Sequence, residues 1–498
     1  MPTVTAPVRA RFTRPGRDPE RPPHPTLVLG VILATYLMVV LDASVVITAL
    51  PSIQSGLDFS PAQLSWVQSA YALTFGGFLL LGARAGDVWG RRRTFLWGIA
   101  IFTGASLLGG LAPSAELLLA ARALQGVGAA IAAPSTLALL TTSFAEGPAR
   151  IRALAAYSAV AGAGGSVGLV LGGLLTDWIS WRWALFINVP VGVVLLALAP
   201  GVLPETARRP GRFDLAGAAT STAGMTALVY GFVRAAEAGW GDTLAVASFV
   251  AGAVLLTAFV AIERTAAQPI TPLRLFSSRR RSGAYVARML LVGGMFSMFF
   301  FLSQYLQGVR GYGPLEAGLA FLPMTLVMFG MVRQVPRLAA RFGDTRLLVA
   351  GVLVAFTGMA WLSRLEADSG FVLHIAAPLV LLGLGMGSAL APLTAAGISE
   401  VADADAGAAS GVVNAAQQLG GSLGVSVLVT VFASAGGAAA GSPESGTAFS
   451  GLARTELADA IGAALTGSAI LLALGLVTVL IAVTPWRFGL APAAERAR

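Results

Sequence analysis

The stretch at residues 82–95, GARAGDVWGRRRTF, is a short polar segment between two long apolar runs. Its single acid precedes a cluster of three arginines, and glycines occupy positions that allow a tight turn and a close approach of two helices. Charges gathered in one loop can separate and pair again, which suits a segment that switches between two packings. A positively charged anchor with an incidental acid explains the arginines but not the Gly–Asp–Gly spacing. The residues selected here are Gly82, Asp87, Gly90, Arg91 and Arg92.

The composition around this segment is that of a membrane protein. The chain has 498 residues, of which 56% are hydrophobic and 11% are charged, whereas soluble domains average about 25% charged residues. A soluble core cannot bury so much apolar surface, so part of the solvent must be lipid. The sequence therefore predicts an all-α integral membrane protein with several spans.

Composition also excludes several classes of site. The chain has no cysteine and two histidines, so neither a thiolate zinc site nor any other metal site is expected. All 33 basic residues are arginine, so no lysine is available for an ATP-binding phosphate loop. The arginines fall in short loops and form no basic domain, which excludes a nucleic-acid partner and favours a role in membrane orientation. We expect no cofactor.

A span needs about 20 apolar residues to cross the hydrocarbon layer, and this rule predicts fourteen helices. They lie near residues 26–50, 63–82, 93–111, 116–141, 151–175, 182–200, 213–234, 243–262, 284–306, 315–334, 345–363, 371–397, 405–434 and 460–484. Most arginines fall in the N-terminal tail, the C-terminal tail and the loops that follow even-numbered spans. The opposite loops carry Arg182, Arg234, Arg310, Arg364 and Arg454. The asymmetry predicts a multi-pass protein with both termini cytoplasmic.

Two polar, proline-bearing connectors, at 201–212 and 263–282, bracket the seventh and eighth spans. Six spans precede them and six follow, so we expect two similar six-helix bundles with two extra central helices. The binding site of such an architecture lies near the midplane, between the bundles. The expected parts are a cytoplasmic tail at 1–25, an N-terminal bundle at 26–200, a linker with two helices at 201–282, a C-terminal bundle at 283–485 and a cytoplasmic tail at 486–498.

Two charged residues lie inside the predicted spans, at some depth. Asp42 is the one charge in VVLDASVVITALP, residues 39–51, and a carboxylate at the centre of a span costs roughly 2.5–3.5 kcal/mol. It is either a structural ion pair, a residue that snorkels to the surface, or a carboxylate that exchanges protons. Arg122 is either a helix-end anchor or the electrostatic partner of a carboxylate. We expect the two residues at different depths.

Polar and aromatic side chains at span depth are candidates for the lining of a substrate cavity. The stretch MFSMFFFLSQYLQ, residues 295–307, is either a lipid-facing stripe or an adaptable surface for varied apolar ligands. The cavity candidates are Gln68, Tyr71, Phe75, Gln125, Asn188, Phe299, Gln304, Asn414 and Gln418.

Several segments together resemble the fourteen-helix drug:proton antiporters of the major facilitator superfamily. The segment at 82–95 is similar to the superfamily's first signature, and LDASVVITALP to the motif of the first helix. RALQGVGAA at 122–130, WRWALFINVPVG at 181–192, and the segments at 303–323 and 407–427 follow in the family's order. The resemblance implies the major facilitator fold, a cytoplasmic gate at the first signature, and proton coupling through Asp42 and Arg122.

The fifth span departs from the family at one position. GGSVGLVLGGLL keeps glycines that form a smooth helix face, but Leu169 replaces the proline that the family carries before the glycine pair. This loses a kink-forming residue in the helix that the resemblance links with antiport direction. The packing glycines are Gly164, Gly168, Gly172 and Gly173.

The leading hypothesis is therefore a transporter that exports drugs or amphipathic small molecules by alternating access, powered by the proton gradient. It would reside in the cell membrane, have protons, lipid and a small substrate as partners, and work as a monomer. One alternative is proton-coupled transport of one specific metabolite or siderophore. A remote alternative is an intramembrane enzyme or sensor, but we expect no enzymatic activity.

Overall fold

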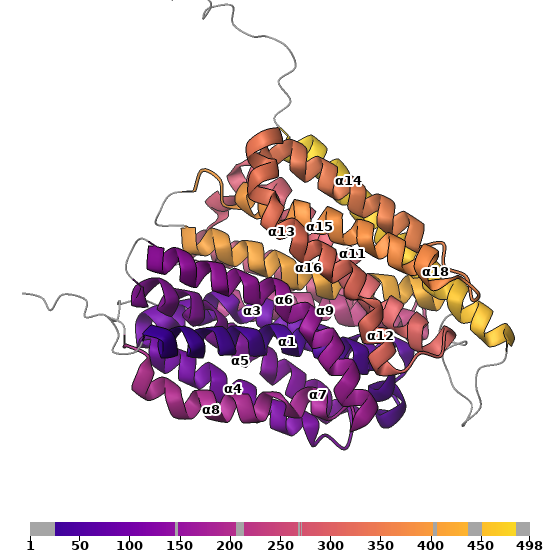
Figure 1. Ribbon diagram of the computed structural model, residues 1–498, viewed down its shortest axis with the longest axis horizontal. Helices are drawn as coiled ribbons and strands as arrows, with labels where there is room; N and C mark the ends of the chain where they lie inside the picture. The colour runs from indigo at the N-terminus through magenta and orange to yellow at the C-terminus, as the bar shows by residue number, and fades with distance from the viewer. Residues whose placement is uncertain are drawn as a thin grey trace, which may run out of the picture.

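The structure is a computed structural model that describes residues 25–144, 148–205, 214–266, 269, 271–401, 406–436 and 451–484. These residues form helices and connecting turns, with no strand in the ranges just given. In Figure 1 the helices run side by side, the indigo and magenta ones below and the orange and yellow ones above. The all-α class predicted from composition is confirmed.

The N-terminal half consists of the elements from α1 to α8. They are α1 (Pro25–Leu57), α2 (Pro61–Leu64), α3 (Trp66–Trp89), α4 (Arg91–Gly110), α5 (Ala115–Ser143), α6 (Pro148–Trp178), α7 (Trp183–Phe186) and α8 (Asn188–Val202). We call the end of the molecule at which α3 passes into α4 the arginine end, and the other the opposite end.

The C-terminal half follows a hairpin of α9 (Leu215–Ala238) and α10 (Thr243–Thr265). Its helices are α11 (Arg279–Gln304), α12 (Pro314–Ala320), α13 (Leu322–Phe342), α14 (Asp344–Leu362), α15 (Ala377–Gly397), α16 (Ala406–Ser434) and α18 (Gly451–Thr478). A 3₁₀ turn at Leu273–Ser277 precedes α11, and π-helical turns cover Tyr305–Val309, Val372–Ala376 and Val479–Val483.

Ten helices of the described chain are long and apolar enough to cross a membrane. Over the described residues, the helices α3, α4, α6 and α9 are not among those ten. Each predicted span overlaps a helical segment. The number of fourteen membrane crossings stays a prediction.

The two halves meet mainly where α3 contacts α16, where α1 contacts α11, and where α6 contacts α12 and α13. At the opposite end, Ser303 Oγ donates to Ile47 O at 3.1 Å and Gln307 Nε2 donates to Thr48 O at 3.1 Å. Side chains of the C-terminal half thus bind backbone carbonyls of α1, which joins the halves at this end.

The hairpin of α9 and α10 contacts both halves through α9. A Cβ at Gly77 of α3 would overlap Thr222, so α3 and α9 approach closely. Toward the C-terminal half, Thr430 Oγ1 of α16 donates to Phe232 O at 3.0 Å. Asp242 caps α10 by accepting from Leu244 N and Ala245 N, and its hydrogen bond from Arg234 lowers the pKa of the Asp242 carboxyl.

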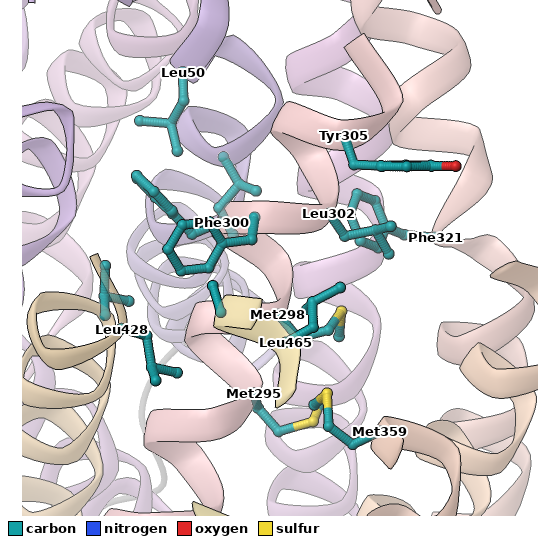
Figure 2. Packing of buried hydrophobic residues seen from close by; sticks show 14 of the residues in the cluster. Leu50, Met295, Met298, Phe300, Leu302, Tyr305, Phe321, Met359, Leu428 and Leu465 are labelled. Atoms are coloured by element: carbon teal, nitrogen blue, oxygen red, sulfur yellow. The ribbon is translucent and has the colours of Figure 1, made fainter. Parts of the chain in front are cut away.

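The core of the C-terminal half forms around α11. Figure 2 shows Met295, Met298 and Phe300 of α11 among side chains from neighbouring helices, including Met359 of α14 and Leu428 of α16. Met298 and Phe300 are fully buried. The lipid-facing interpretation of this stretch is wrong, because α15, α16 and α18 surround α11 on several sides.

Candidate functional site

Asp42 lies near the middle of α1 and is fully buried. The sequence placed it about two turns from the end of the first helix, and this is wrong. Helix α1 continues through Pro51 to Leu57, so Asp42 is roughly 22 Å from that end at the usual rise of a helix. A snorkelling side chain does not reach water over this distance, so Asp42 needs partners inside the protein.

Three side chains supply those partners. Arg122 Nη1 binds Asp42 Oδ2 at 2.6 Å, and both residues are almost completely shielded from solvent. The second oxygen, Oδ1, accepts from Gln125 Nε2 at 3.0 Å and from Asn188 Nδ2 at 2.8 Å. Asp42 and Arg122 therefore lie at the same depth, which corrects the expectation that they would not.

Arg122 is itself held by its neighbours. Its Nε donates to Val67 O at 2.9 Å and its Nη1 to Gln125 Oε1 at 3.0 Å. The Cζ atom lies 4.6 Å from the centroid of the Tyr71 ring, a distance typical of a cation–π contact. Arg122 and Gln125 are three residues apart on α5, so both side chains project toward α1 from one helix face.

Ser106 completes this network, and the sequence gave no reason to select it. Its Oγ on α4 accepts from Gln125 Nε2 at 2.7 Å. A serine inside an apolar helix is common, because its hydroxyl can bond to the preceding turn, as Ser106 does with Phe102 O. Nothing in the sequence therefore separates Ser106 from other serines at helix interiors.

The hydrogen bonds of Asp42 join three helices. An ionised carboxylate only accepts hydrogen bonds, whereas a protonated one also carries an O–H donor. Arg122, Gln125 and Asn188 all point donors at Asp42, and a carboxylate has acceptor positions for all three. These donors come from α5 and α8, so a movement of α1 relative to α5 or α8 would change the hydrogen bonds of Asp42.

The remaining cavity candidates do not hydrogen-bond to Asp42, although the Tyr71 ring contacts Arg122. Gln68, Tyr71 and Phe75 lie on α3, and the rings of the last two are 5.7 Å apart. The amide of Gln68 and the hydroxyl of Tyr71 are buried and have no hydrogen-bond partner among the described residues.

The other four candidates lie in the C-terminal half. Gln304 and Phe299 belong to α11, and the Phe299 ring is 5.3 Å from that of Phe321. Asn414 and Gln418 belong to α16, where Asn414 is exposed and Gln418 packs beside Gly76 of α3. The candidates on α3 and α16 thus lie near the contact between the two halves, whereas Gln304 and Phe299 lie on α11.

At the arginine end, Arg92 binds a partner that the sequence did not indicate. Its Nε lies 3.6 Å from Glu205 Oε2, just beyond α8, and its backbone N donates to Glu205 Oε1 at 3.2 Å. Gly90 joins α3 to α4 with φ 99°, a left-handed conformation that favours glycine. Arg91 follows as the first residue of α4.

Gly82 and Asp87 belong to the same segment, residues 82–95. A Cβ at Gly82 would overlap Ala130 O, so α3 and α5 approach closely there. The predicted contact of Asp87 with the arginines concerns a side chain outside the described ones. Glu205 is a single acid in a connector. It lies far along the chain from the segment at 82–95, so the sequence does not indicate its ion pair with Arg92.

The glycines of α6 bring that helix against two partners. A Cβ at Gly164 would lie 2.8 Å from Val40 Cγ1, and one at Gly172 would overlap Val45 O, so both face α1. Gly168 likewise meets Ser44, and Gly173 meets Pro314 of α12. Helix α6 runs without interruption through Leu169, whose carbonyl accepts from Thr48 Oγ1 at 3.3 Å.

The chain is similar to several known proteins over most of its length. A puromycin resistance protein of Streptomyces alboniger is 45% identical over 408 residues, covering 81% of each chain. A cephamycin export protein of Amycolatopsis lactamdurans is 43% identical over 446 residues, covering 88% of this chain and 91% of the relative.

Solved structures share the fold at low sequence identity. A bacterial homologue of the human lysosomal transporter Spinster, in an inward-facing conformation, matches with a TM-score of 0.66 and 16% identity, covering 93% of this chain and 97% of that one. The family model of the Major Facilitator Superfamily matches residues 32–425. The two-bundle fold, the homologous exporters and this match agree, and the chain is a transporter that belongs to the major facilitator superfamily.

Proposed function

We propose that the protein exports antibiotics or other amphipathic small molecules across the cell membrane in exchange for protons. The observation that carries the proposal is Asp42, a fully buried carboxylate whose hydrogen-bond donors come from two other helices. The names of the relatives support the substrate class, since one is a puromycin resistance protein and another a cephamycin export protein.

Asp42 is the proton carrier in this proposal, and Arg122 controls when the proton binds. In this proposal α1 shifts relative to α5 within the N-terminal half when the protein changes conformation, so that Arg122 withdraws from Asp42 and the carboxylate takes a proton. When the pair forms again, the proton leaves on the side to which the site is then open. Substrate and proton favour different conformations, so the proton gradient drives export.

The orientation of the chain follows from its arginines. We place both termini and the arginine end in the cytoplasm, because arginine-rich loops stay on that side. The segment at 82–95, with Arg92 bound to Glu205, then acts as a cytoplasmic gate. The protein works as a monomer in this proposal, and needs no cofactor or nucleic acid.

The test is transport by the purified full-length chain in liposomes with an imposed pH gradient. Export of puromycin and of a lipophilic cationic dye should follow the gradient and stop when a protonophore collapses it. The Asp42→Asn variant should lose gradient-driven transport at least tenfold. The Asp58→Asn variant, which changes an exposed acid at the end of α1, should transport like the parent protein.

Transport that is equal with and without the gradient would refute the coupling, and so would full activity of Asp42→Asn. The breadth of export is measured by resistance profiles in an efflux-deficient host, with and without the protonophore. Resistance to several unrelated compounds is expected. Import of one metabolite along the gradient would replace the export proposal by the alternative of a specific transporter.

A further inference from the structure

Arg288 is a buried cation of the C-terminal half that the proposed proton site does not use. It lies on α11, is 9% exposed and contacts two neighbouring helices. Its Nη1 donates to Thr394 Oγ1 of α15 at 2.7 Å, and its Nη2 to Gln417 Oε1 of α16 at 2.5 Å. Leu390 O accepts a longer bond of 3.5 Å. All of these partners are neutral.

Two other arginines with equally buried side chains are satisfied in different ways. Arg122 binds the carboxylate of Asp42. Arg281, at the start of α11, donates to four backbone carbonyls, including Leu275 O at 3.0 Å and Glu400 O at 3.0 Å, and so ties helix ends together. Arg288 has neither arrangement, and its buried Nε has no hydrogen-bond partner among the described residues.

A buried charge without a counterion is expensive, and proteins retain such groups mainly where they act on a ligand or an ion. The depth of Arg288 narrows the choice of anion. Nine residues separate it from the start of α11 at Arg279, which is about 14 Å along the helix. A lipid headgroup at the surface does not reach that depth, so the anion belongs to a small molecule that enters between the helices.

Arg288 faces the boundary between the halves. Residues 288, 292, 296, 299 and 303 are three or four apart and share one face of α11, and Ser303 on that face binds Ile47 O of α1 in the other half. On α16, Gln417 binds Arg288 while the next residue, Gln418, packs against α3 at Gly76. Arg288 is therefore beside the contact of α3 with α16.

Apolar side chains lie further along the same face of α11. Phe296 and Phe299, about 12 Å and about 17 Å from Arg288 by the rise of a helix, are half-buried, whereas Phe300 and Phe301 are buried in the core. Asn414, one turn before Gln418 on α16, is exposed. A molecule at this place would meet a guanidinium, neutral hydrogen-bonding groups and two aromatic rings.

We propose that Arg288, together with Thr394 and Gln417, binds the carboxylate of acidic amphipathic substrates, whose apolar part rests on Phe296 and Phe299. The guanidinium suits this task because its planar donors match a carboxylate. The proposal rests on the proposed export function and adds a substrate class to it. The cation for the substrate and the carboxylate for the proton then lie in different halves.

Binding to the purified full-length chain tests the proposal without transport. The probes are the fluorescent amphipaths 4-(1-pyrenyl)butyrate and 4-(1-pyrenyl)butanol, which differ in the carboxylate. We expect the parent protein to bind the butyrate more tightly. Arg288→Gln should weaken binding of the butyrate about tenfold or more and leave that of the butanol unchanged, while Arg288→Lys should keep most of the preference.

A matched control is Arg333→Gln, which removes an exposed arginine of α13 and should change neither affinity. Equal loss of both probes in Arg288→Gln would assign Arg288 a structural role and overturn the proposal. Absence of a preference in the parent protein would overturn it as well. Failure of gradient-driven transport would instead count against the export function, since the binding assay needs no gradient.

Discussion

Arg122 and Arg288 are buried arginines, one in each half, with different partners. Arg122 donates from its guanidinium to one side chain on a neighbouring helix and one on its own helix, and Arg288 donates to side chains on two neighbouring helices. Arg122 faces the carboxylate of Asp42 at 2.6 Å, whereas the partners of Arg288 are a hydroxyl, an amide and a carbonyl. The N-terminal half thus contains both charges of its pair, and the C-terminal half leaves one charge available to a ligand.

In the proposed mechanism, this difference allows the Asp42 site to respond to a proton and the Arg288 site to respond to an anionic substrate. A site whose charges cancel responds to a proton, because protonation removes one of the two charges. A site with one unpaired cation responds to an anion. The first prediction tests this division where the expected effect is largest.

Arg122→Met should destabilise the protein by about 3–5 kcal/mol, because it leaves Asp42 buried without its cation. The double variant Asp42→Asn/Arg122→Met should lose much less, because no charge then remains. Thermal unfolding in detergent of the parent, the two single variants and the double variant measures the coupling. Additive losses would show that the pair does not act as a unit.

Gly172→Ala should have the next largest effect, about 1–3 kcal/mol, because its Cβ would push α1 away from α6. Gly165→Ala is the matched control on the same helix. No atom lies within 4 Å of a Cβ at Gly165, so this change should be neutral or stabilise α6 by up to about 1 kcal/mol.

The comparison of Gly172→Ala with Gly165→Ala also tests whether the Asp42 site and the Arg288 site are independent. Displacing α1 should impair gradient-driven transport through Asp42 while the affinity for 4-(1-pyrenyl)butyrate at Arg288 stays the same. Loss of both in Gly172→Ala would mean that the sites are not independent.

Arg288→Gln should change the free energy of unfolding by less than about 1 kcal/mol, since it removes a charge whose described hydrogen-bond partners are all neutral and keeps a hydrogen-bonding side chain. The same thermal assay applies, in the absence of any probe. A loss of unfolding free energy as large as that of Arg122→Met would contradict the difference between the two arginines. It would indicate that Arg288 has an anionic partner outside the described residues.

Glu205→Gln should have the smallest effect, below about 1 kcal/mol, because its ion pair with Arg92 is partly exposed and screened by salt. Arg92 keeps its bonds to Pro200 O and Leu203 O in this variant. The difference from the parent protein should vanish as salt is raised, and a salt-independent difference would contradict a solvent-screened pair.

The sequence predicts the charged members of the site well and their geometry poorly. Asp42 and Arg122 stand out because a charge in an apolar run is rare. Their common depth was missed because the first span was predicted to end near residue 50, whereas α1 continues through Pro51 to Leu57. Proline is tolerated inside a membrane helix when neighbouring groups satisfy the backbone, and hydropathy does not register this.

The contacts of neutral polar residues are also hard to predict from the sequence. Gln125 and Asn188 were selected as cavity lining, and the sequence did not indicate that both donate to Asp42. A sequence shows that an amide lies at a certain depth, but its direction depends on how helices rotate against each other. Glu205 was missed for a related reason, since 113 positions separate it from Arg92.

The family and the helical class follow from local patterns. The apolar runs and the order of short motifs were enough to predict the fold. The match of the family model to residues 32–425 confirms the superfamily. The stretch at 295–307 remained ambiguous, because a helix that is apolar on all sides reads the same in lipid and in a protein core. Its burial became evident only with α15, α16 and α18 in place.

The attachment of α9 has a mechanical consequence. Thr222, Tyr230 and Glu237 join it to the N-terminal half, through Gly77, through the Trp66 ring at 6.4 Å, and through Ser60 Oγ at 2.9 Å. Its hydrogen bond to the other half comes from Thr430. Helix α9 also packs along α16, so it bridges the two halves. A relative movement of the halves therefore has to change the packing of α9 on at least one of its two sides.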